Sequence, residues 1–216
     1  MKGEGIEARS MPESESSLGG RLPLLAPSEL SGAQRETYAR GSKLFRLSDS
    51  VGFQSRTSDG RLIGPFNAAL YSPGVSAGWL NFMEAEETNT SLDKRVRQVV
   101  ILAVGAVWKS SYELYAHAAE ARQVGLPDKV IAALVAGQLP PQLSDDEMLA
   151  ARFAQQLTAE RRVDAALYAE AERAYGPRGL VDLTLLVGFF HTTCAVLNAF
   201  EVPAPQASDP ATKRKD

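Results

Sequence analysis

Cysteine and histidine are scarce in this chain of 216 residues, which has one cysteine and two histidines. A single cysteine, Cys194, excludes an intrachain disulfide and an intrachain dithiol redox pair, and it fits a reducing cytoplasm. Two histidines without a surrounding cluster of cysteine, aspartate and glutamate argue against a structural zinc site. We therefore expect no metal.

The sequence also lacks a glycine-rich phosphate loop, a nucleophile elbow and a dinucleotide-binding fingerprint. Its net charge of −3 gives no reason to expect nucleic acid or an anionic membrane as a partner. The first twenty residues are polar and rich in glycine and serine, so we expect no secretory signal. The apolar segment 180–200 contains Asp182, His191 and Asn198, which are costly at the centre of a bilayer. We interpret it as a buried helix of a soluble protein.

The hydrophobic pattern predicts an all-α protein with one folded domain over residues 28–203. Residues 1–27 lack apolar periodicity and predict a disordered or loosely tethered arm, and residues 204–216 predict a flexible tail. Helices are expected at residues 31–47, 65–71, 75–88, 110–125, 127–136, 145–161, 164–175 and 178–200. A further helix is expected to begin after an N-cap at residues 89–91 and to end at residue 108.

Two capping boxes and one turn dipeptide mark particular boundaries. Ser31 with Gln34 begins the first helix, and Ser144 with Glu147 begins a later one. The dipeptide Asp59–Gly60 favours a tight turn that closes a small hairpin.

The segment Arg95–Leu126 carries the clearest chemical signal. Residues 99–108 are almost wholly apolar and predict a buried helix, and the next segment holds Glu113 and His117. Residues four apart lie one turn above the other on one helix face, so the carboxylate can orient the imidazole and raise its pKa. The same spacing also describes an exposed ion pair worth about 0.3 kcal/mol. Glu120 is expected to be solvated surface.

Further candidates for ligand binding are two arginines and the second histidine. Arg95 and Arg97 lead the apolar helix, and an arginine can hold a carboxylate bidentately, although we expect at least one of them to be solvated. His191 lies between Thr184 and Asn198 at seven-residue spacing, which makes a polar stripe on the last helix. Because buried polar groups need partners, His191 is either a satisfied core histidine or part of a pocket.

Several segments in a fixed order resemble the carboxymuconolactone decarboxylase family: DGRLIGPFN at 59–67, RVRQVVIL at 95–102, Tyr112-Glu113 followed by His117, and Gly125-Leu126. The closing segments 187–190 and 197–203 look like the last helix of that family. The resemblance covers roughly residues 30–203. It implies an alkylhydroperoxidase D-like helical fold and a homo-oligomer, either a trimer or a hexamer.

The alkylhydroperoxidase D-like branch of that family has the motif Cys-x-x-Cys-x-x-x-His, with a glutamate upstream that helps to activate the thiols. By this resemblance Ser110 and Glu113 stand at the two cysteine positions, and His117 keeps the histidine. Gln98 stands at the position of the upstream glutamate. Without thiolates the peroxidatic cycle has no nucleophile, so the decarboxylase-like branch is the better match.

The family reaction removes carbon dioxide from a lactone that carries a carboxylate and returns a proton to carbon, without a metal or an organic cofactor. The resemblance implies that His117 is the acid and that Glu113 orients it. It predicts a cofactor-independent lyase acting on a small carboxylated lactone or a related intermediate of aromatic-compound breakdown.

The resemblance also suggests groups that bind the substrate. Arg95 or Arg97 would hold the departing carboxylate, and Asn67 would donate a hydrogen bond at the pocket. His191 stands where family members more often have a small hydroxylic residue, which indicates a different substrate.

Two alternatives stay open. One is a thiol-dependent peroxidase that uses Cys194 alone. The other is a non-catalytic oligomeric binding scaffold, which would be favoured if Glu113 and His117 faced solvent away from any cavity.

Overall fold

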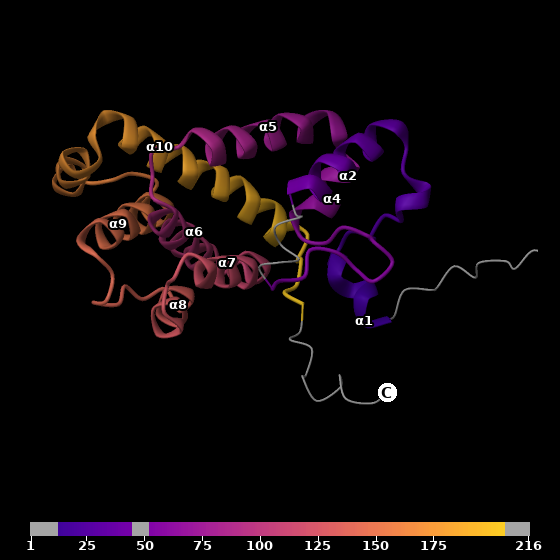
Figure 1. Cartoon of the computed structure of the whole chain (residues 1–216), viewed down its shortest axis with the longest axis horizontal. Coiled ribbons are helices and arrows are strands. Elements are labelled where there is room, and N and C mark those ends of the chain that lie inside the picture. Colours follow the sequence, from indigo (N-terminus) through magenta and orange to yellow (C-terminus); the bar gives the residue numbers. More distant parts are fainter. Residues whose placement is uncertain (1–12, 45–51, 206–216) are drawn as a thin grey trace, which may run out of the picture.

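The structure, a computed structural model, describes residues 13–44 and 52–205. Within these ranges the regular structure is helical, and an isolated β-bridge joins Arg56 to Leu62. The predicted all-α class is confirmed. The elements follow the chain as α1 (Glu13–Ser16), η1 (Ser17–Gly19), η2 (Pro27–Glu29), α2 (Gly32–Leu44), α4 (Pro65–Tyr71), α5 (Pro73–Asn89), α6 (Lys94–Trp108), α7 (Ser111–Gln123), α8 (Asp128–Val135), α9 (Asp145–Glu160) and α10 (Ala165–Ala199) (Figure 1).

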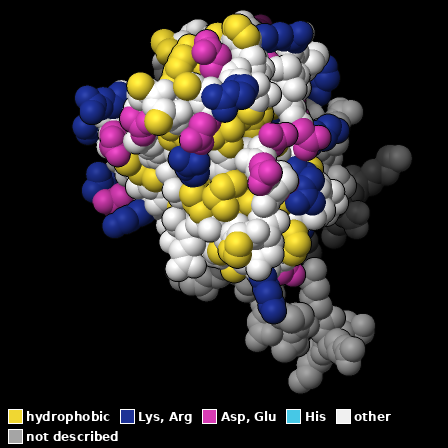
Figure 2. All heavy atoms as spheres, turned by 90° about the vertical axis from the view of Figure 1, so that its left-hand side faces the viewer, with side chains coloured by type: hydrophobic (Ala, Val, Ile, Leu, Met, Phe, Trp, Pro, Cys, Tyr) yellow, Lys and Arg dark blue, Asp and Glu magenta, His cyan; other side chains and the backbone are white. Residues whose placement is uncertain are grey.

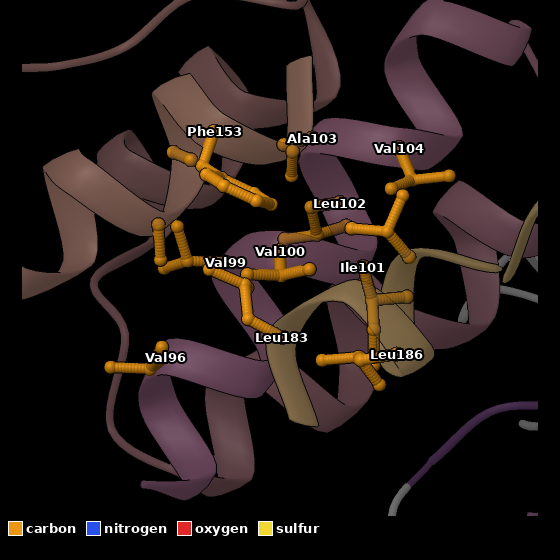
Figure 3. Close-up of a cluster of buried hydrophobic side chains, with 14 of the residues drawn as sticks. Val96, Val99, Val100, Ile101, Leu102, Ala103, Val104, Phe153, Leu183 and Leu186 are labelled. Atoms are coloured by element: carbon orange, nitrogen blue, oxygen red, sulfur yellow. The ribbon is translucent and has the colours of Figure 1, made fainter. Parts of the chain in front are cut away.

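Helix α6 lies at the centre of the fold, and α7, α8, α9 and α10 pack around it. Its residues Val99–Val104 are at most 1% exposed. Figure 3 shows their side chains gathered with Phe153 of α9 and with Leu183 and Leu186 of α10. A helix that is apolar on all sides is stable only when it is buried on all sides. The composition of α6 therefore requires other helices to pack around it. Its N-cap is Asp93, slightly later than predicted.

Local sequence signals set other boundaries as predicted. The Ser144 side chain accepts a hydrogen bond from the Glu147 backbone N–H, and the Glu147 carboxylate accepts one from the Ser144 N–H. Ser31 and Gln34 form the same reciprocal pair at the start of α2. The predicted end of that helix, near residue 47, lies outside the described residues.

Glycine permits two sharp changes of chain direction. The predicted turn at Gly60 closes a small hairpin, in which the Thr57 N–H donates to the Arg61 carbonyl. The two predicted C-terminal helices form α10, which is kinked at Gly176 (φ 65°) just before Pro177. Both glycines have positive φ, a conformation that costs other residues free energy.

The segment before α2 packs against the domain. The prediction of a disordered arm is wrong for residues 17–27, which contain three buried apolar side chains: Leu18, Leu24 and Ala26. Asn67 of α4 fastens this segment, because its Nδ2 donates to the Pro23 carbonyl and its Oδ1 accepts from the Leu25 N–H. The segment is irregular, so its apolar residues follow no period. The predicted limits of a single domain at residues 28 and 203 stay a prediction.

Helix α10 is long and apolar enough to cross a membrane by length and composition, but half of its most apolar stretch is buried inside the protein. That burial is typical of the core helix of a soluble protein. Figure 2 shows the end of the molecule where α8 and α9 lie, and the surface there mixes hydrophobic patches with side chains of both charges.

Two clusters of buried side chains meet beside α5. One is built mainly on α6, α8, α9 and α10, and the other on α4, α7 and the segments around residues 18–30 and 53–63. Trp79 and Met83 of α5 pack against both clusters. The candidate site lies at this junction.

Candidate functional site

A cavity of about 500 Å³ lies between α5, α6, α7 and α10. Its apolar wall includes Phe53, Phe66, Trp79, Ile101, Tyr112, Phe189 and Phe190. Its polar wall includes Glu86, Glu87, Lys94, Arg97, Gln98, Glu113, His117 and Glu120. The volume and the mixture of aromatic and convergent polar groups are typical of a site for a small organic ligand.

Helix α7 places Glu113 and His117 one turn apart in the cavity wall. His117 Nε2 lies 3.1 Å from Glu113 Oε1, and the two side chains are 14% and 4% exposed. Burial rules out the interpretation of this pair as an exposed surface ion pair. Helices α6 and α7 approach closely here because Gly105 has no side chain: a Cβ there would lie 3.1 Å from Leu114 Cδ2.

A second carboxylate and an amide contact the other ring nitrogen of His117. Nδ1 lies 2.9 Å from Gln98 Oε1 and 3.3 Å from Glu120 Oε2. Gln98 Nε2 donates to Glu120 Oε2 at 3.0 Å. Glu120 is 35% exposed, so it keeps contact with solvent as predicted, but it is also part of the site, which the sequence did not predict. It lies three residues after His117, and α6 supplies Gln98 as its partner across the helix interface.

The two carboxylates favour the charged form of His117. Burial alone lowers the pKa of this imidazole, but Glu120 and then Glu113 outweigh burial and raise the pKa to about 10. Burial by itself raises the pKa of Glu120. The opposite effects of His117, Gln98 and Arg97 are together larger, so the pKa of Glu120 lies below its usual value. At neutral pH the imidazole is thus an imidazolium with a proton on both nitrogens.

The Nε2 atom of His117 faces the Glu113 carboxylate. Among the described residues, Glu113 Oε1 accepts no hydrogen bond, although His117 Nε2 is only 3.1 Å away. The contact is therefore an ion pair in which the N–H is not aligned with the carboxylate. The Phe190 ring meets the imidazole edge to face at 5.1 Å between centroids, which helps to fix the ring plane.

The structure separates the two candidate arginines. Arg97 lines the cavity, and its Nε and Nη2 both donate to the Glu86 carboxylate. Arg95 is not among the cavity-lining residues. Its Nε pairs with Glu147 Oε1 at 2.7 Å, and its Nη1 donates to the Gly125 carbonyl.

Asn67 and His191 are not brought to the cavity either. Asn67 is buried and holds the segment before α2, as described above. His191 Nε2 lies 2.9 Å from Thr158 Oγ1 of α9, and its ring packs on Trp108. Burial lowers its pKa. His191 is thus half-buried with a hydrogen-bond partner, which agrees better with a satisfied histidine than with a pocket residue.

Cys194 is not among the residues that line the cavity. The thiol is fully buried, and its pKa is raised by burial and by the charge of Glu113, against a smaller opposite effect of Ser110. A buried thiol with a raised pKa is a poor nucleophile. In the described part of the chain, no group of three or more His, Cys, Asp or Glu side chains has an arrangement suited to a metal ion.

Sequence reasoning missed several residues of the site. Trp79, Phe189 and Phe190 are ordinary core aromatics by pattern, and nothing local marks them as cavity wall. Glu86 was also missed. Its pairing with Arg97 depends on how α5 and α6 meet, and no spacing in the sequence encodes that contact.

Residues 73–156 match the sequence model of the carboxymuconolactone decarboxylase family. This stretch runs from α5 into α9 and contains Glu113 and His117. A search of the curated proteins found no match.

Solved structures share the fold. An uncharacterized peroxidase-related protein from Ralstonia eutropha, an alkylhydroperoxidase AhpD core, aligns with a TM-score of 0.69 at 17% identity, over 87% of this chain and 93% of that one. A peroxidase-related protein from Silicibacter gives 0.65 at 17% identity over the same shares. A debrominase in complex with 2,3,4-tribromopyrrole gives 0.64 at 11% identity, over 85% and 90%. The predicted alkylhydroperoxidase D-like fold is confirmed.

Proposed function

We propose that this protein is a cofactor-independent lyase that decarboxylates a small ring acid in the cavity, in keeping with the match of residues 73–156 to the carboxymuconolactone decarboxylase family. The single observation that carries the proposal is the position of the His117 imidazole, which is held between the Glu113 and Glu120 carboxylates in the wall of an aromatic cavity. A group that is protonated at neutral pH can act as an acid and can stabilise negative charge.

The proposed step needs only groups that line the cavity. The bond between the ring carbon and the substrate carboxylate breaks, carbon dioxide leaves, and the electron pair delocalises onto the lactone carbonyl. His117 Nε2–H stabilises this charge and then gives its proton to the carbon. Water later returns a proton to the imidazole. The balance is one carboxylate and one proton converted to carbon dioxide and a C–H bond.

Glu113 and Glu120 support this role by keeping His117 protonated until the proton is needed. The aromatic side chains make part of the wall apolar, and an apolar surrounding strengthens charge interactions at the reacting carbon. For the carboxylate of the substrate, Arg97 is the better of the two predicted arginines because it lines the cavity. Lys94 is a further cation in the same wall.

Neither alternative has an observation that favours it. A peroxidase would require Cys194, which is buried and does not line the cavity. A position of Glu113 and His117 in solvent, away from any cavity, would favour a pure binding scaffold, and both side chains instead lie in a cavity wall. The homo-oligomeric state and the cytoplasmic location stay predictions.

Turnover of carboxymuconolactone, followed as carbon dioxide release, tests the proposal. We expect turnover by the wild type and a loss of about 10²-fold or more in His117→Ala, the usual contribution of a general acid. Glu84→Gln is the matched control, because Glu84 lies on α5 but pairs with exposed Arg40 outside the cavity.

Folding of each variant is checked by circular dichroism and a thermal melt, with His117→Gln as a second variant of similar size. Unchanged turnover in a folded His117 variant would remove this residue from the mechanism. Absence of turnover by the wild type would contradict decarboxylation of this lactone.

A further inference from the structure

The ion pair between Arg97 and Glu86 is the other charged feature of the cavity wall. Arg97 Nε lies 3.3 Å from Glu86 Oε1, and Nη2 lies 2.5 Å from Oε2, so the guanidinium edge is engaged by both carboxylate oxygens. The Arg97 and Glu86 side chains are 14% and 6% exposed. The pair joins α5 to α6 and contributes both side chains to the cavity lining.

A guanidinium this deeply placed needs an anion beside it. Removing one partner of a buried ion pair typically costs about 3–5 kcal/mol, because the remaining charge is left uncompensated. Glu86 is the partner observed at Arg97. The two contacts are the bidentate arrangement in which arginine commonly binds carboxylates, including those of small molecules.

We infer that Arg97 and Glu86 form a carboxylate-exchange subsite, in which the carboxylate of a bound ring acid replaces Glu86 on the Arg97 guanidinium. The ring acid as ligand rests on the proposed function. The ligand takes over the charge and the two hydrogen bonds that Glu86 supplies, and its ring lies against the aromatic wall. A carboxylate placed beside Glu86 on the same guanidinium would instead face like-charge repulsion.

The position of Glu86 on its helix suits such an exchange. It lies in the last turn of α5, where its carbonyl accepts the hydrogen bond of the Thr90 N–H that ends the helix. Release therefore needs a new side-chain conformation and leaves the helix backbone intact. Glu86 acts as a specificity-determining residue, because a neutral ring compound cannot displace it and gains nothing from Arg97.

Calorimetric titration with benzoate and benzamide, two ligands of similar shape and different charge, tests this subsite directly. Glu86→Gln keeps the shape of residue 86 and removes the competing charge. We expect benzoate to bind at least 10-fold more tightly to Glu86→Gln than to the wild type, and benzamide affinity to change less than 2-fold. Glu84→Gln, on the same helix but outside the cavity, should leave both affinities unchanged.

Equal benzoate affinities in Glu86→Gln and the wild type would overturn the inference. So would an equal gain for benzoate and benzamide, which would reflect a change of cavity shape. Adding Arg97→Gln to Glu86→Gln should abolish the gain for benzoate. If Glu86→Gln does not fold, Glu86→Asp takes its place, because the shorter side chain cannot keep both contacts and should give a smaller gain in the same direction.

The measurement does not depend on turnover. A gain in benzoate affinity together with an absence of decarboxylation would support the subsite and contradict the lyase. Decarboxylation together with an unchanged benzoate affinity in Glu86→Gln would support the lyase and contradict the subsite.

Discussion

Replacing Glu120 with glutamine should lower the pKa of His117 while leaving the shape of the site unchanged. The carboxylate Oε2 lies 3.3 Å from the imidazole Nδ1. Two unit charges at that separation interact by about 5 kcal/mol at an effective dielectric constant of about 20. The Glu120 side chain is 35% exposed, so solvent screening reduces the interaction to about 1 kcal/mol. Since about 1.4 kcal/mol corresponds to one pH unit, the pKa of His117 should fall by about 1 pH unit.

The ¹⁵N chemical shifts of the imidazole nitrogens, followed from pH 5 to 11 in labelled protein, report this pKa directly. Glu84→Gln removes the same charge from an exposed position on α5 and should leave the His117 titration in place. An unchanged or higher pKa in Glu120→Gln would refute the assignment of Glu120 as the main cause of the raised value.

The same shift predicts how stability depends on pH. The pKa of His117 rises from the usual 6.5 to about 10 in the folded protein, so the folded state binds the proton more tightly than the unfolded state. The stabilisation is complete below about pH 6.5 and is lost as pH rises towards 10, at up to about 1.4 kcal/mol per pH unit. Urea denaturation at pH 6, 8 and 10 measures it. The loss should be smaller in His117→Gln, and an equal loss in both proteins would contradict the linkage.

Two further predictions concern the cavity wall and the single cysteine. Gly64→Ala should destabilise the protein by about 1–3 kcal/mol in urea denaturation, because Gly64 has φ 67° and a Cβ there would lie 2.4 Å from Tyr112 Cε1. Gly78→Ala, on an open face of α5 with nothing within 4 Å, should be neutral or stabilising, and a similar loss in both variants would refute the steric argument. Cys194 is buried and its pKa is raised, so a thiol reagent such as Ellman's reagent should modify it only on unfolding; rapid modification of the native protein would show that the thiol is accessible.

The sequence by itself determined the features that depend on nearby residues. The capping box at Ser144 is a contact across three residues, and the pairing of Glu113 with His117 is a contact across one helical turn. The kink at Gly176 reflects what glycine and the following proline allow the backbone to do. Each of these is set by dihedral angles and by side-chain reach along one segment, so a reader of the sequence can predict it.

Tertiary structure alone decided which charges meet. Arg95 and Arg97 stand two residues apart and look equivalent in sequence, yet one pairs with Glu147 of α9 and the other with Glu86 of α5 in the cavity. Glu120 becomes part of the site because Gln98 of α6 lies opposite it. These contacts depend on the packing of helices around α6, which buries apolar side chains from distant segments of the chain. The spacing of residues along a helix determines on which face of the helix a side chain lies. Only the packing of the helices determines which residues that face contacts.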